Sequence, residues 1–157
     1  MTDLTIEQGD PTQPDVVRLL QSHLDYAREW SLPENVRVLD ATRLSDEGVR
    51  FFTARNEGKL VGIGALSPFE DRHAEIKSMH TIEEARERGV GWALLERLLG
   101  TAIEQECRRV SLETGTSEAF ASARRLYARA GFKTCPPFGE YRRCPDSICM
   151  TRRLPAS

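Results

Sequence analysis

One stretch decides the fold: Glu75-Ile-Lys-Ser-Met-His-Thr-Ile-Glu-Glu-Ala-Arg-Glu-Arg-Gly-Val-Gly-Trp-Ala-Leu-Leu-Glu-Arg-Leu-Leu99. Its pattern predicts a strand over Glu75–Thr81, a charged turn over Glu83–Arg88 and a helix from Gly89 onward. The helix prediction rests on apolar residues that recur at helical spacing and form one broad stripe. These residues are Val90, Leu94, Leu95, Leu98, Leu99, Ala102 and Ile103.

The start of this helix carries two glycines, Gly89 and Gly91, which lower helix propensity. Without a Cβ, the backbone N–H groups of the Arg86–Gly91 turn can approach an anion closely. The helix N-terminus adds unpaired donors and a partial positive charge. Arg86 and Arg88 bring full positive charge, which suits phosphate. The turn alone therefore predicts an anion site, and a tight strand-to-helix turn with solvated arginines is the alternative.

Two blocks carry a resemblance to a known family. Arg86-Glu-Arg-Gly-Val-Gly91 resembles the Arg/Gln-x-x-Gly-x-Gly/Ala signature of the GNAT superfamily of acyl-CoA-dependent N-acyltransferases. Ala123-Arg-Arg-Leu-Tyr-Ala-Arg-Ala-Gly-Phe132 is similar to that family's Ala-x-x-Leu-Tyr-x-x-x-Gly-Phe element. They occur in the usual order, with the strand-like segment Arg109–Thr114 between them. The similarity covers residues 49–152 well and points to small bacterial single-domain members.

The resemblance implies an α/β fold with a mixed, mostly antiparallel central sheet and helices on both faces. A single domain over residues 1–157 is expected, which suits the length of the chain. The residue pattern adds further elements. They are a strand over Asp3–Gln8, a helix from Asp15 to about Glu29, a hairpin of Val49–Arg55 and Lys59–Leu66, a polar connection over Pro68–His73, and a last strand over Ser147–Thr151 at or near the sheet edge.

Bulk composition narrows the function. The formal net charge of −2 argues against a nucleic-acid partner, which favours a basic excess. No apolar run is long enough to span a membrane, and the first residues lack a signal segment, so we expect a cytoplasmic protein. The four cysteines have no metal-site spacing, so reduced thiols and no metal are expected.

The resemblance also implies a reaction: an acetyl group moves from acetyl-CoA to the primary amine of a small molecule or amino acid, by direct attack in a ternary complex. The pantetheine arm would lie along Met79, His80 and Thr81, pairing with the strand backbone. The pyrophosphate would lie on the turn. The residues expected there are Arg86, Glu87, Arg88, Gly89, Val90, Gly91 and Trp92.

Two residues are the catalytic candidates. Tyr127 occupies the family's usual position for the acid that returns a proton to the thiolate, and ring packing beneath the cofactor is the alternative. Glu75 matches a catalytic glutamate of several members, and a surface pair with Lys77 is the alternative. His73 and His80 are further candidates for the base. Strand alternation places His80 on the opposite face from Glu75 unless the strand carries a bulge.

The acceptor side is less defined. Glu140 and Tyr141 precede the last strand and could contact the acceptor, and Arg37 follows the first helix near where the family's acceptor pocket lies. Two other functions stay open: acetylation of a protein or peptide at lysine or the N-terminus, and a non-catalytic acyl-CoA sensor. A homodimer is also left open.

Two positions depart from the family pattern. Phe120 replaces an asparagine that often contacts the cofactor, and Trp92 replaces a basic residue that often follows the second glycine. Both changes predict weaker cofactor contacts with the same reaction.

Overall fold

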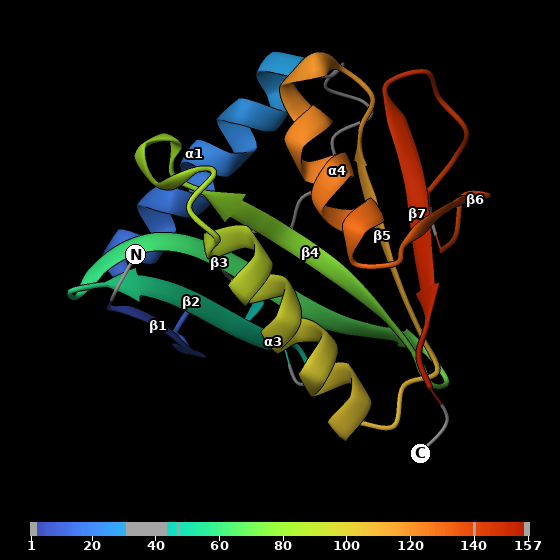
Figure 1. The fold of residues 1–157 in the computed structure, drawn as a ribbon, viewed down its shortest axis with the longest axis horizontal. Helices are drawn as coiled ribbons and strands as arrows, with labels where there is room; N and C mark the ends of the chain where they lie inside the picture. Colours follow the sequence, from blue (N-terminus) through green and yellow to red (C-terminus); the bar gives the residue numbers. More distant parts are fainter. Residues whose placement is uncertain (1–2, 31–43, 47, 140, 156–157) are drawn as a thin grey trace.

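The computed structural model describes residues 3–30, 44–46, 48–139 and 141–155 (Figure 1). These residues form one strand, a helix, three strands, a helix, a strand, a helix and two final strands, with short 3₁₀ turns before the last two helices. The elements are β1 Leu4–Gln8, α1 Pro14–Trp30, β2 Arg50–Asn56, β3 Lys59–Glu70, β4 His73–Thr81, η2 Glu83–Ala85, α3 Val90–Glu104, β5 Arg109–Gly115, η3 Glu118–Phe120, α4 Ala121–Arg129, β6 Lys133–Cys135 and β7 Ser147–Arg153.

One seven-stranded sheet joins all the described strands in the order β1-β2-β3-β4-β5-β7-β6. Only β4 and β5 pair in parallel, and the other neighbours are antiparallel. The mixed, mostly antiparallel sheet is therefore confirmed. The last long strand, β7, lies one position in from the edge, because the short β6 covers it.

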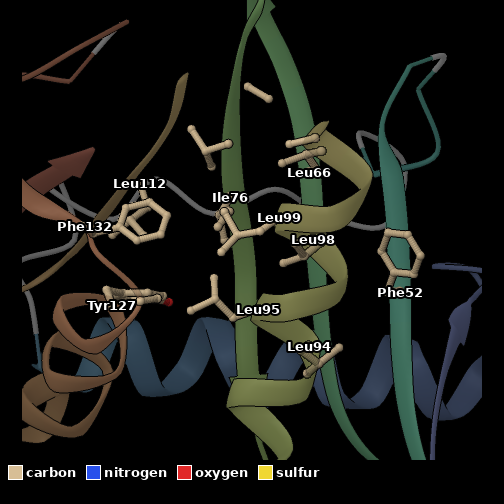
Figure 2. Close-up of a cluster of buried hydrophobic side chains, with 14 of the residues drawn as sticks. Phe52, Leu66, Ile76, Leu94, Leu95, Leu98, Leu99, Leu112, Tyr127 and Phe132 are labelled. Atoms are coloured by element: carbon tan, nitrogen blue, oxygen red, sulfur yellow. The ribbon is translucent and has the colours of Figure 1, made fainter. Parts of the chain in front are cut away.

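Helices cover both faces of the sheet, as expected (Figure 1). The apolar stripe of α3 packs with α4 and one sheet face into the larger core, which includes Leu94, Leu98 and Tyr127 (Figure 2). On the other face, α1 contributes Val16, Leu19 and Leu20 to a second cluster. No helix among the described residues is long and apolar enough to cross a membrane.

The polar connection predicted over Pro68–His73 is wrong. Strand β3 continues to Glu70, and β4 already begins at His73. Pro68 has no N–H to donate to a neighbouring strand. The strand nevertheless continues, because the register shifts between Pro68 and Glu70 and such an irregularity accommodates proline. The chain reverses over Asp71 and Arg72 instead, where Arg72 has φ 56°.

A β-bulge interrupts β4 at Ser78. The register with β3 shifts between Ile63 and Ala65, and Ser78 has φ 57°. One extra residue reverses the alternation of side chains beyond it. His80 therefore lies on the same sheet face as Glu75, which is the exception that the sequence had left open.

Candidate active site

The central strands β4 and β5 separate along their length. They pair only where His73, Ala74 and Glu75 face Arg109, Val110 and Ser111. Beyond Glu75 the two strands diverge into a V that opens toward the η2 turn (Figure 1). No strand among the described residues pairs with β4 over residues 76–81 on the β5 side. An open strand edge of this kind can pair with an extended ligand.

The turn before α3 provides donors at the mouth of this V. Gly89 is the N-cap residue, with φ 86°, and no side chain caps the helix. The Ala93 N–H donates to the Gly89 carbonyl at 3.0 Å, so the preceding N–H groups of Val90, Gly91 and Trp92 have no partner within the helix. A Cβ on Gly89 would meet nothing within 4 Å. The space above Gly89 is open, which fits an anion cradle.

The second glycine has a different local cause. A Cβ at Gly91 would lie 3.2 Å from Leu126 on α4. Gly91 therefore allows α3 and α4 to pack closely, and close packing explains this position without any ligand. The sequence had assigned both glycines to anion access, and this contact supplies a structural reason for one of them.

The two arginines of the turn differ in their surroundings. Arg86 donates through Nε to the Thr81 carbonyl at 3.2 Å, and its guanidinium lies 5.0 Å from the Tyr26 ring centroid on α1. Arg88 is exposed, with no ion pair to a described residue. Trp92 lies beneath the Arg129 guanidinium at 4.9 Å. Arg129 thus brings positive charge near the position where the family often has a basic residue.

Backbone strain occurs both on β4 and in the turn before α3. Glu87 has φ 62°, and Ser78 at the bulge has φ 57°. Left-handed conformations cost a non-glycine residue about 1–2 kcal/mol, and such strain tends to occur at functional sites. The buried Ser78 Oγ has no hydrogen-bond partner among the described residues. A ligand lying along β4 is one source of such a partner.

Tyr127 lies on α4 inside the larger core and is 5% exposed. Its ring packs against Phe132, and Figure 2 shows its hydroxyl directed toward α3 and β4. Burial raises the pKa of Tyr127, and the negative charge of Glu113 raises it further. The phenol therefore stays protonated at working pH and can act as a donor.

Glu75 takes part in a closed group of three polar side chains. The Tyr141 hydroxyl donates to Glu75 Oε2, and Lys77 Nζ lies 3.2 Å from the same oxygen. Lys77 also donates to the Tyr141 hydroxyl at 3.0 Å. Burial raises the pKa of Tyr141, and the nearby Glu75 charge adds to the rise. The structure thus contains the Glu75–Lys77 pair and brings Tyr141 from the loop before β7 onto it.

A histidine pair lies on the same sheet face. His23 on α1 and His80 on β4 place their Nδ1 atoms 3.2 Å apart, so one ring donates to the other. The Tyr26 ring lies 5.9 Å from His80, centroid to centroid. Burial lowers the pKa of His23 to about 4. Burial, together with the positive charges of His23 and Arg86, lowers the pKa of His80 to about 3.

This pair should make the fold sensitive to acid. Both folded-state pKa values lie below the ordinary value of about 6.5, so the stabilisation is complete above about pH 6.5 and is lost as pH falls toward the folded values. Each histidine should cost roughly 2 kcal/mol between pH 6.5 and pH 5. His23→Gln removes one titration and the repulsion on His80. Urea unfolding across pH should therefore show a much shallower slope in the variant. An unchanged slope would contradict this prediction.

The matching family model is that of the acetyltransferase (GNAT) family, and it covers residues 16–132. The chain belongs to the GNAT family. It is 36% identical to the uncharacterized N-acetyltransferase YedL of Escherichia coli, over 96% of this chain and 99% of the relative. It is 34% identical to an IAA acetyltransferase of Azospirillum brasilense, over 98% and 100%. These relatives support an acetyltransferase activity for this GNAT protein.

Solved structures agree on the fold. A Klebsiella pneumoniae protein classed as an acyl-CoA N-acyltransferase aligns with a TM-score of 0.79 and 27% identity, over 96% of this chain and 97% of that one. A Bacillus subtilis acetyltransferase in complex with CoA aligns with a TM-score of 0.69 and 20% identity, over 97% and 99%. The GNAT fold thus extends over nearly the whole chain.

Two predicted site residues of this GNAT protein, Arg37 and Glu140, lie outside the residues that the structure describes. Among the placed ones, the strand and turn residues lie along the V and at its mouth, whereas Glu75 lies at its closed end. The Val90 side chain is 1% exposed and packs in the core, so Val90 offers only its N–H at the turn.

Two neighbours of the site, Tyr26 and Ser78, were missed. Tyr26 lies three residues after His23 on α1, and this spacing places both on one helix face, so helical periodicity could have found the pair. The Ser78 bulge leaves no comparable signal in a single sequence. Phe120 packs its ring against Tyr26, at 5.5 Å between centroids, and against Gly115, where a Cβ would lie 2.1 Å from the ring.

Proposed function

We propose that this GNAT protein transfers an acetyl group from acetyl-CoA to the primary amine of a small molecule or an amino acid. The observation that carries the proposal is the V between β4 and β5, whose open mouth meets the donor-rich start of α3. A free strand edge and a helix N-terminus together suit an extended amide chain that ends in phosphates.

The described residues fit acetyl-CoA in three ways. The unpaired β4 edge, including Met79, His80 and Thr81, offers backbone groups to the pantetheine amides. The Ser78 hydroxyl lacks a partner among the described residues. The turn from Arg86 to Trp92 offers N–H groups, open space above Gly89 and nearby positive charge. The B. subtilis acetyltransferase of the same fold was solved with CoA.

The proposed chemistry is direct attack without a covalent enzyme intermediate. The amine nitrogen forms a bond to the thioester carbonyl carbon, and the carbon–sulfur bond breaks. Glu75 takes the proton that the amine loses, directly or through water, and Tyr127 donates to the departing thiolate. N–H groups near Met79 stabilise the developing oxyanion.

Lys77 makes Glu75 a weaker base. Proton uptake by Glu75 competes with the Lys77 ion pair at 3.2 Å and with the hydrogen bond from Tyr141. Lys77 also offsets the charge of the carboxylate, so Glu75 attracts a cationic amine less than an unpaired carboxylate would. His80 lies on the same face and is the second candidate for the base, although its lowered pKa weakens it.

The acceptor is proposed from the charges around Tyr141. Arg142 and Arg143 follow it in sequence and are exposed. In this proposal they bind the carboxylate of the acceptor, while Glu75 faces its amine. This arrangement favours an amino acid over a neutral aromatic amine. The relatives restrict the acceptor little, because YedL is uncharacterized and the A. brasilense protein is named for IAA.

The test is a thiol-release screen with acetyl-CoA across amines, amino acids, aminoglycosides and lysine peptides. We expect the highest rate with a small amino acid. In Glu75→Gln, the rate should fall roughly 10- to 100-fold, less than for an isolated general base because the amine can also lose its proton to water. The acidic limb of the pH–rate profile should flatten. Glu7→Gln, on the exposed edge strand, is the matched control.

Each outcome has a separate meaning. Highest activity on lysine peptides would overturn the small-molecule acceptor and keep acetyl transfer. An unaltered pH profile in Glu75→Gln would remove Glu75 as the base and leave His80 or water. Binding of acetyl-CoA with no thiol release on any acceptor class would favour the sensor.

A further inference from the structure

A second charged site lies at the opposite end of the sheet from the mouth of the V. The start of β5, the end of β7 and the β3–β4 turn meet at one corner of the molecule (Figure 1). A cavity of about 370 Å³ is hollowed there. Its lining consists of Arg108, Arg109, Arg153 and Leu154, so three of the four side chains are cationic.

The backbone beneath these arginines is tightly held. The Arg108 and Arg109 N–H groups both donate to the Arg72 carbonyl, at 2.7 Å and 3.3 Å. The Leu154 N–H donates to the Arg108 carbonyl at 2.8 Å. Arg109 and Arg153 are also directly paired across β5 and β7. The three arginines therefore extend from a fixed backbone frame, so ligand binding need not order the backbone as well.

The three guanidinium groups have no ion pair or hydrogen bond to another side chain in the described part of the chain. The positive charge of Arg109 acts on the neighbouring His73. Burial lowers the pKa of His73 and the Arg109 charge lowers it further, whereas Glu70 raises it. Like charges that share a concave site repel one another, and a bound anion would relieve that repulsion.

We propose that this cavity binds a small multivalent anion of the phosphate type. Guanidinium forks match phosphate oxygens in pairs, and three arginines in one lining favour a ligand with several anionic oxygens. A volume of about 370 Å³ suits a compact ligand. The site is separate from the proposed cofactor turn, because its residues come from the other end of the sheet.

The test is isothermal titration of the full chain with inorganic pyrophosphate at a constant ionic strength of about 0.15 M. The titration is run with and without saturating CoA, because pyrophosphate could also bind at the Arg86–Gly91 turn. We expect one site that persists in the presence of CoA, and weaker binding of orthophosphate. The double variant Arg109→Gln/Arg153→Gln should weaken the CoA-resistant site at least about tenfold.

The matched control removes the same charge elsewhere. Arg18→Gln/Arg28→Gln changes two exposed arginines of α1 and should leave the CoA-resistant site unchanged. Thermal unfolding of both double variants checks that each is folded. Absence of a CoA-resistant site in the wild type, or equal binding by both double variants, would overturn the proposal. A chain that fails to bind CoA would still test it, through the difference between the two double variants.

Discussion

Replacing Tyr127 by phenylalanine is expected to lower turnover by roughly 10²–10⁴-fold, the usual contribution of a general acid. The substitution removes one hydroxyl and keeps the ring that packs against Phe132 in the core. Affinity for acetyl-CoA and the folded structure should therefore change little. Steady-state thiol release, with cofactor affinity measured separately by titration, separates the chemical step from binding.

The raised pKa of Tyr127 sharpens what each magnitude would mean. Full transfer of a proton from a buried phenol to a thiolate, whose reference pKa is near ~8.5, is uphill. A loss near tenfold would assign the hydroxyl to hydrogen bonding with the leaving sulfur, and a larger loss would assign it to proton transfer. Glu7→Gln, on the exposed edge strand, is again the control and should leave turnover and affinity unchanged. Full activity of Tyr127→Phe would leave this tyrosine a packing role.

Replacing Gly89 by valine is expected to weaken acetyl-CoA binding by roughly 10²–10⁴-fold. A valine side chain would project into the open space above the turn and keep phosphate oxygens from at least two N–H groups. Hydrogen bonds to charged groups contribute about 1.5–3 kcal/mol each, so the loss of two gives this range. Isothermal titration with acetyl-CoA at low and high salt measures the effect and its ionic part.

The control for this variant matches its backbone strain. Gly58, in the β2–β3 turn, has φ 82° and open space around a built Cβ, much as Gly89 has φ 86° with nothing within 4 Å. Both valine variants should lose about 1–2 kcal/mol of stability from the left-handed conformation. Only Gly89→Val should lose cofactor affinity. Normal binding by Gly89→Val, or equal losses in both variants, would remove the turn as the phosphate cradle.

Local patterns in the sequence determined most of the fold. The apolar stripe from Val90 to Ala102 has the period of a helix, and that period follows from backbone geometry alone. The hairpin around Gly58 and the strands on either side of it follow in the same way from turn chemistry and alternation. The two GNAT motifs needed only their residues and order to indicate the family, which the family model confirmed.

Tertiary structure decided which of those residues meet. A bulge at Ser78 reverses the alternation of β4, and no residue type in a single sequence requires a bulge there, so the position of His80 was open until the register was known. Gly91 and Leu126 are 35 positions apart in the chain, and only the packing of α3 on α4 brings them together. The same is true of Lys77 and Tyr141, whose contact depends on how the loop before β7 lies against the sheet.

The arginine cavity is the clearest case in which tertiary structure, and not the local sequence, brings residues together. Arg108 and Arg109 are adjacent in sequence, and no motif singled them out. Arg153 joins them only because β7 pairs antiparallel with β5 and ends beside its start. Residue type and spacing along the chain thus determined most of the elements and the reaction family. Strand register and helix packing, which depend on contacts between distant residues, decided the geometry of both charged sites.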